Sequence, residues 1–262
     1  MLPVALTALG VGGATVFGVV IGFIFKKISH KFSDIVLSFA AGVMLAAAVL
    51  GLIIPALEHG IMEYGAHKWL SLLVVILGVF AGAVVLNLID KLVPHLHKMA
   101  GKEPDLHTDC GTHNREKMNK VLLFVLAIAI HNLPEGIAAG VGFGTGNNTD
   151  AILLAVGIAL QNIPEGMVIV APMLASGISP KKTFLIASLT GFIEVVGTFI
   201  GYFAGYVSVI LPFALAFAGG TMLYVISDEM IPETHAHGSE RGATYALLVG
   251  FCVMLVTDVL LG

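Results

Sequence analysis

The chain has 262 residues, of which 57% are hydrophobic and only 11% are charged, and its mean hydropathy is +0.97. A soluble domain carries about a quarter charged residues, so this composition excludes an ordinary soluble protein and indicates an all-α polytopic membrane protein. The net charge of −4 says little, because the placement of charges matters more than their sum. We expect a multi-pass protein of the cell membrane, with the lipid bilayer and not nucleic acid as its surroundings.

Eight segments are long enough to cross a bilayer, which requires about 20 apolar residues. They are predicted at residues 4–25, 35–57, 69–89, 121–143, 151–174, 183–205, 209–227 and 243–261. The first has no basic residue before it and no small-residue cleavage site, so we expect a spanning helix and not a removed signal peptide. Together the segments form one predicted transmembrane transporter domain over residues 1–262.

Basic residues predict the orientation, because cytoplasmic loops carry an excess of Lys and Arg. If the loop after the first helix is cytoplasmic, only Lys68 of the 13 basic residues falls outside. The others are Lys26, Lys27, Lys31, Lys91, Lys98, Lys102, Arg115, Lys117, Lys120, Lys181, Lys182 and Arg241. With eight spans, both termini are then extracytoplasmic.

The longest polar stretch, residues 91–119, is a predicted cytoplasmic loop between helices 3 and 4 that contains several histidines. A second cluster of acidic residues and histidines, at 228–237, is predicted to follow helix 7 on the same side. A third, at 58–67, follows helix 2 outside. Such clusters are typical of solvated surfaces, and collection of metal ions at both mouths of a pathway is the alternative.

One hexapeptide is used twice within these apolar segments, as His-Asn-Leu-Pro-Glu-Gly at 131–136 and Gln-Asn-Ile-Pro-Glu-Gly at 161–166. Polar side chains inside a membrane span are costly and usually functional. The spacing i, i+4 places the first side chain and the Glu of each copy on one helix face. The proline removes a backbone hydrogen bond and frees a carbonyl in the preceding turn. The pair therefore predicts a cation site, although a proline kink with amide hydrogen bonds between helices is the structural alternative.

Three acidic residues lie near the centre of a predicted span: Glu135, Glu165 and Glu194. His131 is the mid-span histidine, and Met44 in helix 2 lies at a similar depth, where it offers a thioether or simply packs. Three carboxylates in a low-dielectric site cannot all stay ionised without a compensating cation, so the site should hold either metal or protons. Imidazole with carboxylates suits zinc and other divalent ions such as iron(II), manganese or cobalt.

Internal symmetry favours transport. Helices 4 and 5 are predicted to run antiparallel, yet they carry the same hexapeptide near their midpoints. Such a pair is most simply related by a two-fold axis in the membrane plane, and inverted repeats with broken helices that meet at mid-membrane are a common transporter design.

On these motifs the chain resembles the ZIP (Zrt-, Irt-like protein) family of divalent metal transporters, specifically its bacterial GufA-type branch. The resemblance covers the whole chain, and it implies a 3+2+3 arrangement in which helices 1–3 and 6–8 form inverted repeats around helices 4 and 5. It also implies transport of zinc and related ions, including cadmium, toward the cytoplasm, with no prosthetic group. The metal ligands that it implies are His131, Asn132, Glu135, Gln161, Asn162, Glu165, Glu194 and Met44.

The second hexapeptide departs from some relatives, which have His in place of Gln161 and Asp in place of Asn162. Asn162 lacks a potential bridging charge, so we predict one well-occupied metal and a weaker second site. Glycine-rich faces in helices 1, 6 and 8 pack either within the chain or against a second copy, so a homodimer is a candidate assembly.

Two other classes of function are weighed against metal transport. An intramembrane metalloprotease would want two histidines at i, i+4 with a general-base Glu between them, but helix 4 has one histidine and a proline, so no enzyme is expected. A proton- or sodium-coupled carrier of an organic solute is the alternative function. It is disfavoured because the sequence shows no mid-membrane Arg or Lys to hold an anionic solute.

Overall fold

The computed structural model describes residues 1–25, 29–65, 68–92 and 129–261, and the regular structure in these residues is helical. Seven of the described helices are long and apolar enough to cross a membrane. They are α1 (Leu2–Ile24), α2 (His30–Ala46) continued by η1 (Ala47–Ile53) and α3 (Ile54–Glu63), α4 (Lys68–Leu92), α6 (Asn148–Ala175), α7 (Pro180–Gly205), α8 (Leu211–Val225) continued by η4 (Ile226–Met230) and α9 (Ile231–Thr234), and α10 (Glu240–Leu261).

A further helix covers residues 129–141 and ends in the 3₁₀ turn η3 (Gly142–Thr145). It lies within the predicted span at 121–143, of which residues 121–128 lie outside the described residues. Most of the predicted loop at 91–119 is outside them as well. The all-helical, multi-pass architecture predicted from hydropathy is therefore confirmed.

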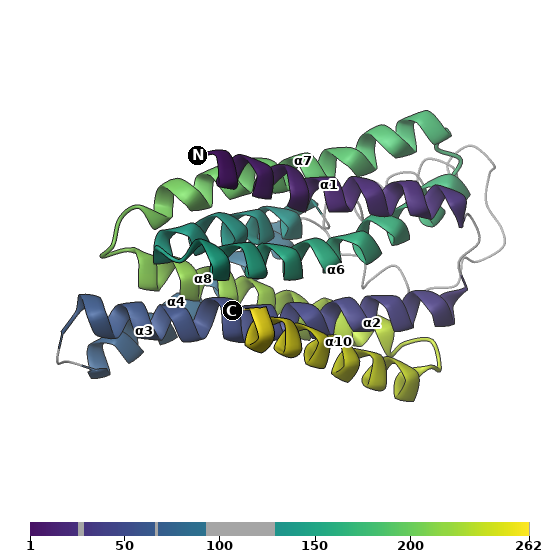
Figure 1. Cartoon of the computed structure of the whole chain (residues 1–262). Helices are drawn as coiled ribbons and strands as arrows, with labels where there is room; N and C mark the ends of the chain where they lie inside the picture. The colour runs from purple at the N-terminus through teal and green to yellow at the C-terminus, as the bar shows by residue number, and fades with distance from the viewer. Residues whose placement is uncertain (26–28, 66–67, 93–128, 262) are drawn as a thin grey trace.

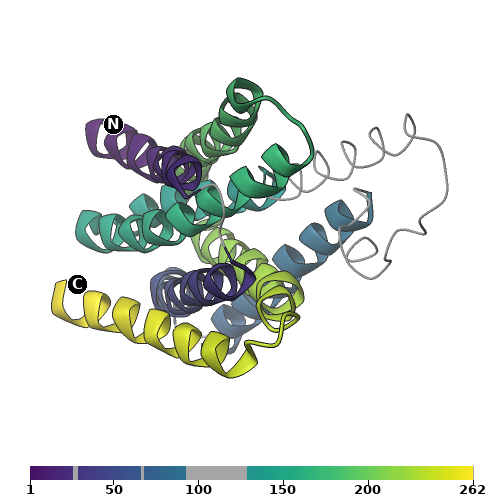
Figure 2. The same ribbon diagram turned by 90° about the vertical axis from the view of Figure 1, so that its right-hand side faces the viewer.

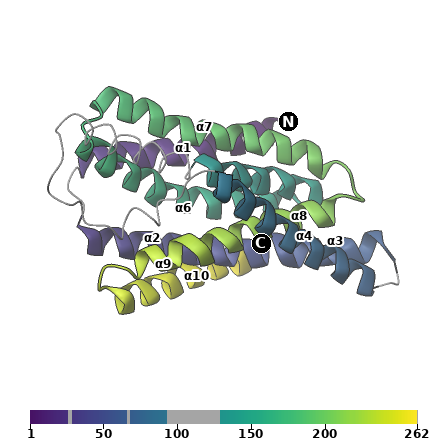
Figure 3. The ribbon, with the colours of Figure 1, turned by 180° about the vertical axis from the view of Figure 1, so that it is seen from behind.

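The helices form two layers (Figure 1). In that view α1, α6 and α7 lie above, and α2, α3, α8 and α10 lie below, with α4 behind them, as the rear view shows (Figure 3). The end-on view separates the two layers (Figure 2). Met1 lies at the end of the bundle where α7 finishes and α6 begins, and Asp258 near the end of α10 interacts there with Asp150 of α6. The chain thus starts and finishes at the same end of the bundle.

Matching glycine contacts relate the first three helices to the last three. Gly18 of α1 packs against the backbone of Ile163 in α6, and Gly197 of α7 packs against the backbone of Leu133 in the 129–141 helix. Ile163 and Leu133 occupy the same position in the two hexapeptides. Because a side chain at either glycine would meet backbone atoms, both helix pairs approach as closely as small residues allow.

The same relation holds for the other helix pairs. Gly42 of α2 packs against the backbone of α10, and Gly220 of α8 packs against the backbone of α4. Between α1 and α7, Gly12 and Gly191 each face the carbonyl of the other, as expected for a contact on a two-fold axis. These contacts agree with the predicted inverted repeats around the two motif helices.

Two predicted helix ends are wrong. Helix 2 was expected over 35–57 and helix 7 over 209–227, but the helical segments run to Glu63 and Thr234. Each contains a wider π-helical stretch, η1 or η4, followed at once by an Ile-Pro pair. A proline is tolerated in the first turn of a helix, so the chain continues helically beyond it. The cluster at 228–237 therefore begins inside a helix and not after one.

The ends of α6 place the second hexapeptide at its middle. Asn147 caps the first turn, because its Oδ1 accepts the Thr149 N–H at 3.0 Å. Gly146 before it has φ +80°, which glycine adopts without strain. The helix ends at Ala175; two residues on, Gly177 has φ +81°, and the Ile178 N–H bonds the Met173 carbonyl at 3.2 Å. Residues 161–166 thus lie about halfway along the helix.

Candidate metal centre

Seven of the eight predicted ligands lie where the 129–141 helix, α6 and α7 meet, and the eighth, Met44, lies on α2. Seven of the eight are at most 6% exposed, and Glu165 is half-buried. Both hexapeptides are helical through their prolines. The structure thus carries two amide-bearing motifs and their carboxylates into the protein interior, where polar groups are stable only if they are paired.

Glu194 of α7 is the hydrogen-bonding centre of this region. Its Oε1 accepts the hydroxyl of Thr15 at 2.5 Å and the Nδ2 group of Asn132 at 2.5 Å. Its Oε2 accepts the Nδ2 group of Asn162 at 2.5 Å. One carboxylate therefore ties together α1, both motif helices and α7, and the two asparagines hold matching positions on it.

Other polar atoms beside this carboxylate have no hydrogen-bond partner among the described residues. They are the Oδ1 atoms of Asn132 and Asn162, together with both oxygens of Glu135 and both amide atoms of Gln161, two side chains that interact with each other without forming a hydrogen bond of regular geometry. Buried polar atoms are normally paired, and each exception calls for an explanation such as an ion. A group of unpaired carboxylate and amide oxygens on two adjacent motifs is a suitable donor set for a cation.

The three central carboxylates are close enough to repel one another. Glu135, Glu165 and Glu194 interact electrostatically in every pairing, and the Gln161 amide lies beside Glu135. Two like charges a few ångströms apart in a low-dielectric interior raise the energy by several kcal/mol. Bound cation or protons must offset this repulsion, as the sequence led us to expect.

His131 does not stand alone beside Glu135. Its Nε2 lies 3.0 Å from Oε1 of Glu229, which comes from the π-helical segment η4. Sequence reasoning missed this partner because it placed residue 229 in a loop beyond helix 7. The repeated Ile-Pro pair, which follows Glu229 by two residues as it follows η1 in helix 2, was the signal that could have extended the helix.

Met44 is fully buried, but it belongs to the main apolar cluster of the protein. Its position is that of a packing residue as much as a ligand. Within the described ranges, no three His, Cys, Asp or Glu side chains converge in the manner of a ready-made metal site.

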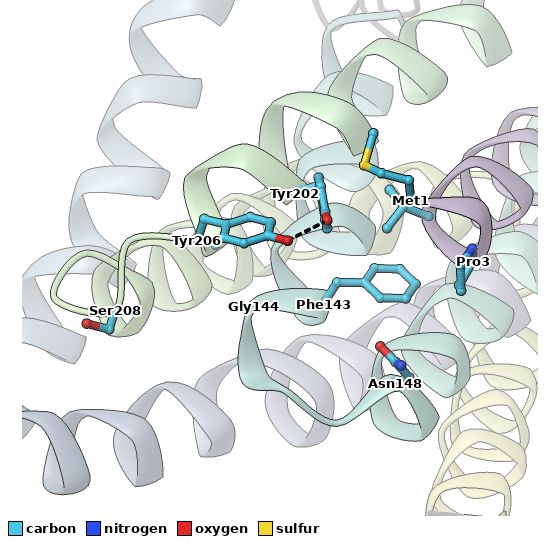
Figure 4. Close-up of a pocket in the computed structure, with 10 residues that line it drawn as sticks. Met1, Pro3, Phe143, Gly144, Asn148, Tyr202, Tyr206 and Ser208 are labelled. Carbon is cyan, nitrogen blue, oxygen red and sulfur yellow. Dashed lines mark hydrogen bonds between the residues drawn. The ribbon is translucent and has the colours of Figure 1, made fainter.

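A separate cavity of about 360 Å³ opens at the end of the bundle where the chain starts. Figure 4 shows the ring of Phe143 below Met1 and Tyr202, with Tyr206 to the left of Tyr202, and the hydroxyl groups of the two tyrosines are 2.9 Å apart. Asn148 lies across the cavity from them. None of the predicted metal ligands lines it. The candidate metal centre is therefore distinct from this surface cavity.

A bundle of membrane-spanning helices that buries carboxylate, amide and imidazole groups on two proline-containing helices is a multi-pass membrane transporter with an internal polar site. Comparison with known proteins defines the group. The family model for the ZIP zinc transporter matches residues 2–122 and 111–258. The chain belongs to the ZIP zinc transporter family, as the resemblance in its motifs predicted.

Individual relatives align with nearly the whole chain. The zinc transporter GufA of Myxococcus xanthus is 39% identical over 96% of both chains. The zinc transporter ZIPB of Bordetella bronchiseptica is 35% identical over 95% of this chain and 78% of its own length. The zinc transporter ZIP11 of Homo sapiens is 32% identical over 95% of this chain and 94% of its own. These are transporters and not enzymes, in agreement with the prediction that no catalytic site is present.

Proposed function

We propose that the protein carries zinc, and with it related divalent ions such as iron(II), manganese, cobalt or cadmium, across the membrane toward the cytoplasm. The observation that carries the proposal is the group of unpaired buried oxygens shared by the two hexapeptides. The proposal extends to zinc because the relatives are zinc transporters by name. Carboxylate, amide and imidazole donors bind such ions moderately, as a site that must release its cargo requires.

In this proposal the ion is held mainly between Glu135 and Glu165, the carboxylates of the two hexapeptides. Gln161 lies beside Glu135, and the unpaired Oδ1 atoms of Asn132 and Asn162 are buried in the same hexapeptides. A double positive charge offsets the repulsion between the carboxylates, which gives the occupied site its stability. Because Asn162 brings no charge, we propose one well-occupied ion and a weaker second position. Met44 and Glu194 remain proposed members of the ligand set.

We propose that the ion leaves the site past His131 and Glu229. His131 precedes Glu135 by one helical turn, on the side of the bundle away from the termini, and it is paired with Glu229. We propose that this side is cytoplasmic, as the basic residues indicate, with both termini outside and residues 91–119 as a cytoplasmic loop. An ion that leaves Glu135 in this direction meets an imidazole and a carboxylate next.

We also propose a homodimer, although fewer glycines are available for its contact than the sequence suggested. Most glycines of α1, α7 and α10, which are the predicted helices 1, 6 and 8, pack within the chain and are not free for a second copy. Gly10 and Gly13 of α1 have no atom of the described residues within 4 Å of an added side chain. The α1 face that carries them is the proposed contact, and light scattering of the detergent-solubilised protein measures its mass.

Uptake of metal into proteoliposomes tests the function. Wild-type protein should accumulate zinc, and Glu135→Gln should not, although it should still insert and migrate as a folded species. Glu240→Gln, which changes an exposed carboxylate at the start of α10, is the matched control and should retain uptake. Competition separates the alternative: a carrier of an organic solute would move that solute without inhibition by zinc, and its uptake of zinc would be absent.

A further inference from the structure

Thr15 of α1 is buried without exposure, and its hydroxyl is 2.5 Å from Oε1 of Glu194. It comes from a helix in which neither the sequence motifs nor the family resemblance identified a ligand. The inverted repeat relates the position of Thr15 in the first three helices to a position in the last three. Gly166, which ends the second hexapeptide, packs against the Thr15 carbonyl, just as Gly136, which ends the first, packs against the Glu194 carbonyl. Thr15 therefore holds in the first repeat the place that Glu194 holds in the last.

The hydrogen bonds around Glu194 fix the direction of two amides. The Nδ2 groups of Asn132 and Asn162 both donate to the Glu194 carboxyl group, one to each of its oxygens. Each Oδ1 atom is then turned away from Glu194, and both are buried with no partner in the described part of the chain. The arrangement leaves two amide oxygens, and not two NH₂ groups, available to a cation.

The Thr15 hydroxyl is the third hydrogen-bond donor to Glu194, and it helps to hold the carboxyl group in this arrangement. Without the Thr15 hydroxyl, Oε1 would accept only the Asn132 amide, and the carboxylate would be held by its two asparagines alone. One hydrogen bond fewer would then hold the Glu194 side chain in place beside Glu135 and Glu165, with which it interacts electrostatically. A buried hydrogen bond of this kind is strong enough to hold a side chain in one position.

We propose that Thr15 is a positioning residue for the transported ion: its hydroxyl fixes Glu194 as a hydrogen-bond acceptor, so that Asn132 and Asn162 present their Oδ1 atoms to the metal. The proposal rests on the proposed function, because it assumes that the cargo binds at the hexapeptides. Oxygen donors favour hard ions over soft ones, so Thr15 should matter more for manganese than for cadmium.

The test compares initial rates of zinc uptake by proteoliposomes over a range of zinc concentrations. Thr15→Val removes the hydroxyl at nearly constant volume, and Thr15→Ser keeps it. We expect Thr15→Val to raise the half-saturating zinc concentration about tenfold or more, with a smaller effect on the maximal rate. Thr15→Ser should behave as wild type. The rise for manganese should exceed the rise for cadmium.

Thr190→Val is the matched control. Thr190 is also buried, on α7, but its hydroxyl bonds only the Ala187 carbonyl of its own helix at 2.8 Å. It should keep the wild-type half-saturating concentration. If Thr15→Val does not fold, Thr15→Ala replaces it with the same expectation, because it also lacks the hydroxyl.

The outcomes separate the two claims. If wild-type protein moves no zinc, the proposed function fails. If wild type moves zinc and the variant without the hydroxyl keeps the wild-type half-saturating concentration, the role of Thr15 is refuted, whatever happens to the maximal rate. An equal loss in Thr15→Ser, or in Thr190→Val, would also refute it, because either result would show a general packing effect.

Discussion

Gly18 and Gly13 lie five residues apart on α1 and form a natural pair for testing how the bundle is held together. A methyl group added at Gly18 meets the carbonyl and Cα of Ile163, inside the second hexapeptide, whereas one added at Gly13 meets no atom within 4 Å among the described residues of its own chain. Both changes to Ala gain about 1 kcal/mol of helix propensity, so this contribution cancels between them. The remaining difference is the cost of overpacking, about 1–3 kcal/mol.

Thermal melting of the purified variants in detergent, followed by circular dichroism, measures this difference. Gly13→Ala should melt at or above the wild-type temperature, and Gly18→Ala should melt below both. Zinc uptake should also fall in Gly18→Ala, because Thr15 lies on the same helix one turn away and bonds Glu194. Equal melting temperatures for the two variants would refute the backbone contact between α1 and α6 on which the repeat relation depends.

Three further predictions concern other parts of the molecule. Glu229→Gln removes the charge beside His131 and should slow zinc uptake roughly tenfold in proteoliposomes, as loss of a partner to a metal-binding histidine typically does; an unchanged rate would remove Glu229 from the pathway. Burial and the Glu63 carboxylate raise the pKa of Tyr64 above 10.0, so its 2.8 Å hydrogen bond to the Val209 carbonyl should be lost only as pH rises through that raised value. Absorbance titration of the phenolate, compared with Tyr64→Phe, measures the pKa. Ionisation of Tyr64 below pH 10.0 would contradict this prediction. In a background without the two native cysteines, Lys181→Cys at the start of α7 should react with an impermeant thiol reagent only from the cytoplasmic side, and labelling from outside would reverse the proposed orientation.

Hydropathy was sufficient to predict the spans, because a helix that crosses a bilayer must be apolar over its whole length. It failed at the ends of the predicted helices 2 and 7. At the end of helix 7 the polar residues 228 and 229 interrupt the apolar run, although the backbone remains helical through η4 and α9. Hydropathy responds to side chains, whereas a helix persists as long as its backbone hydrogen bonds do, so boundaries of this kind are not visible to it.

The site shows the same division between local and distant information. The hexapeptides identified Glu135 and Glu165 because proline and carboxylate stand together in the sequence. Thr15 could not be found in this way, since a single threonine in an apolar helix is ordinary and its partner Glu194 lies far along the chain. Only the close glycine contacts between α1, α6 and α7 bring the hydroxyl to the carboxylate.

The central claim is that the transported ion binds between the two hexapeptides. Anomalous X-ray scattering at the zinc absorption edge, from crystals grown with zinc, locates the ion directly. The account predicts one strong peak bounded by Glu135, Gln161 and Glu165, and its loss in Glu135→Gln. A strong peak elsewhere, such as beside Asp34 and His237 with none at the hexapeptides, would contradict the account.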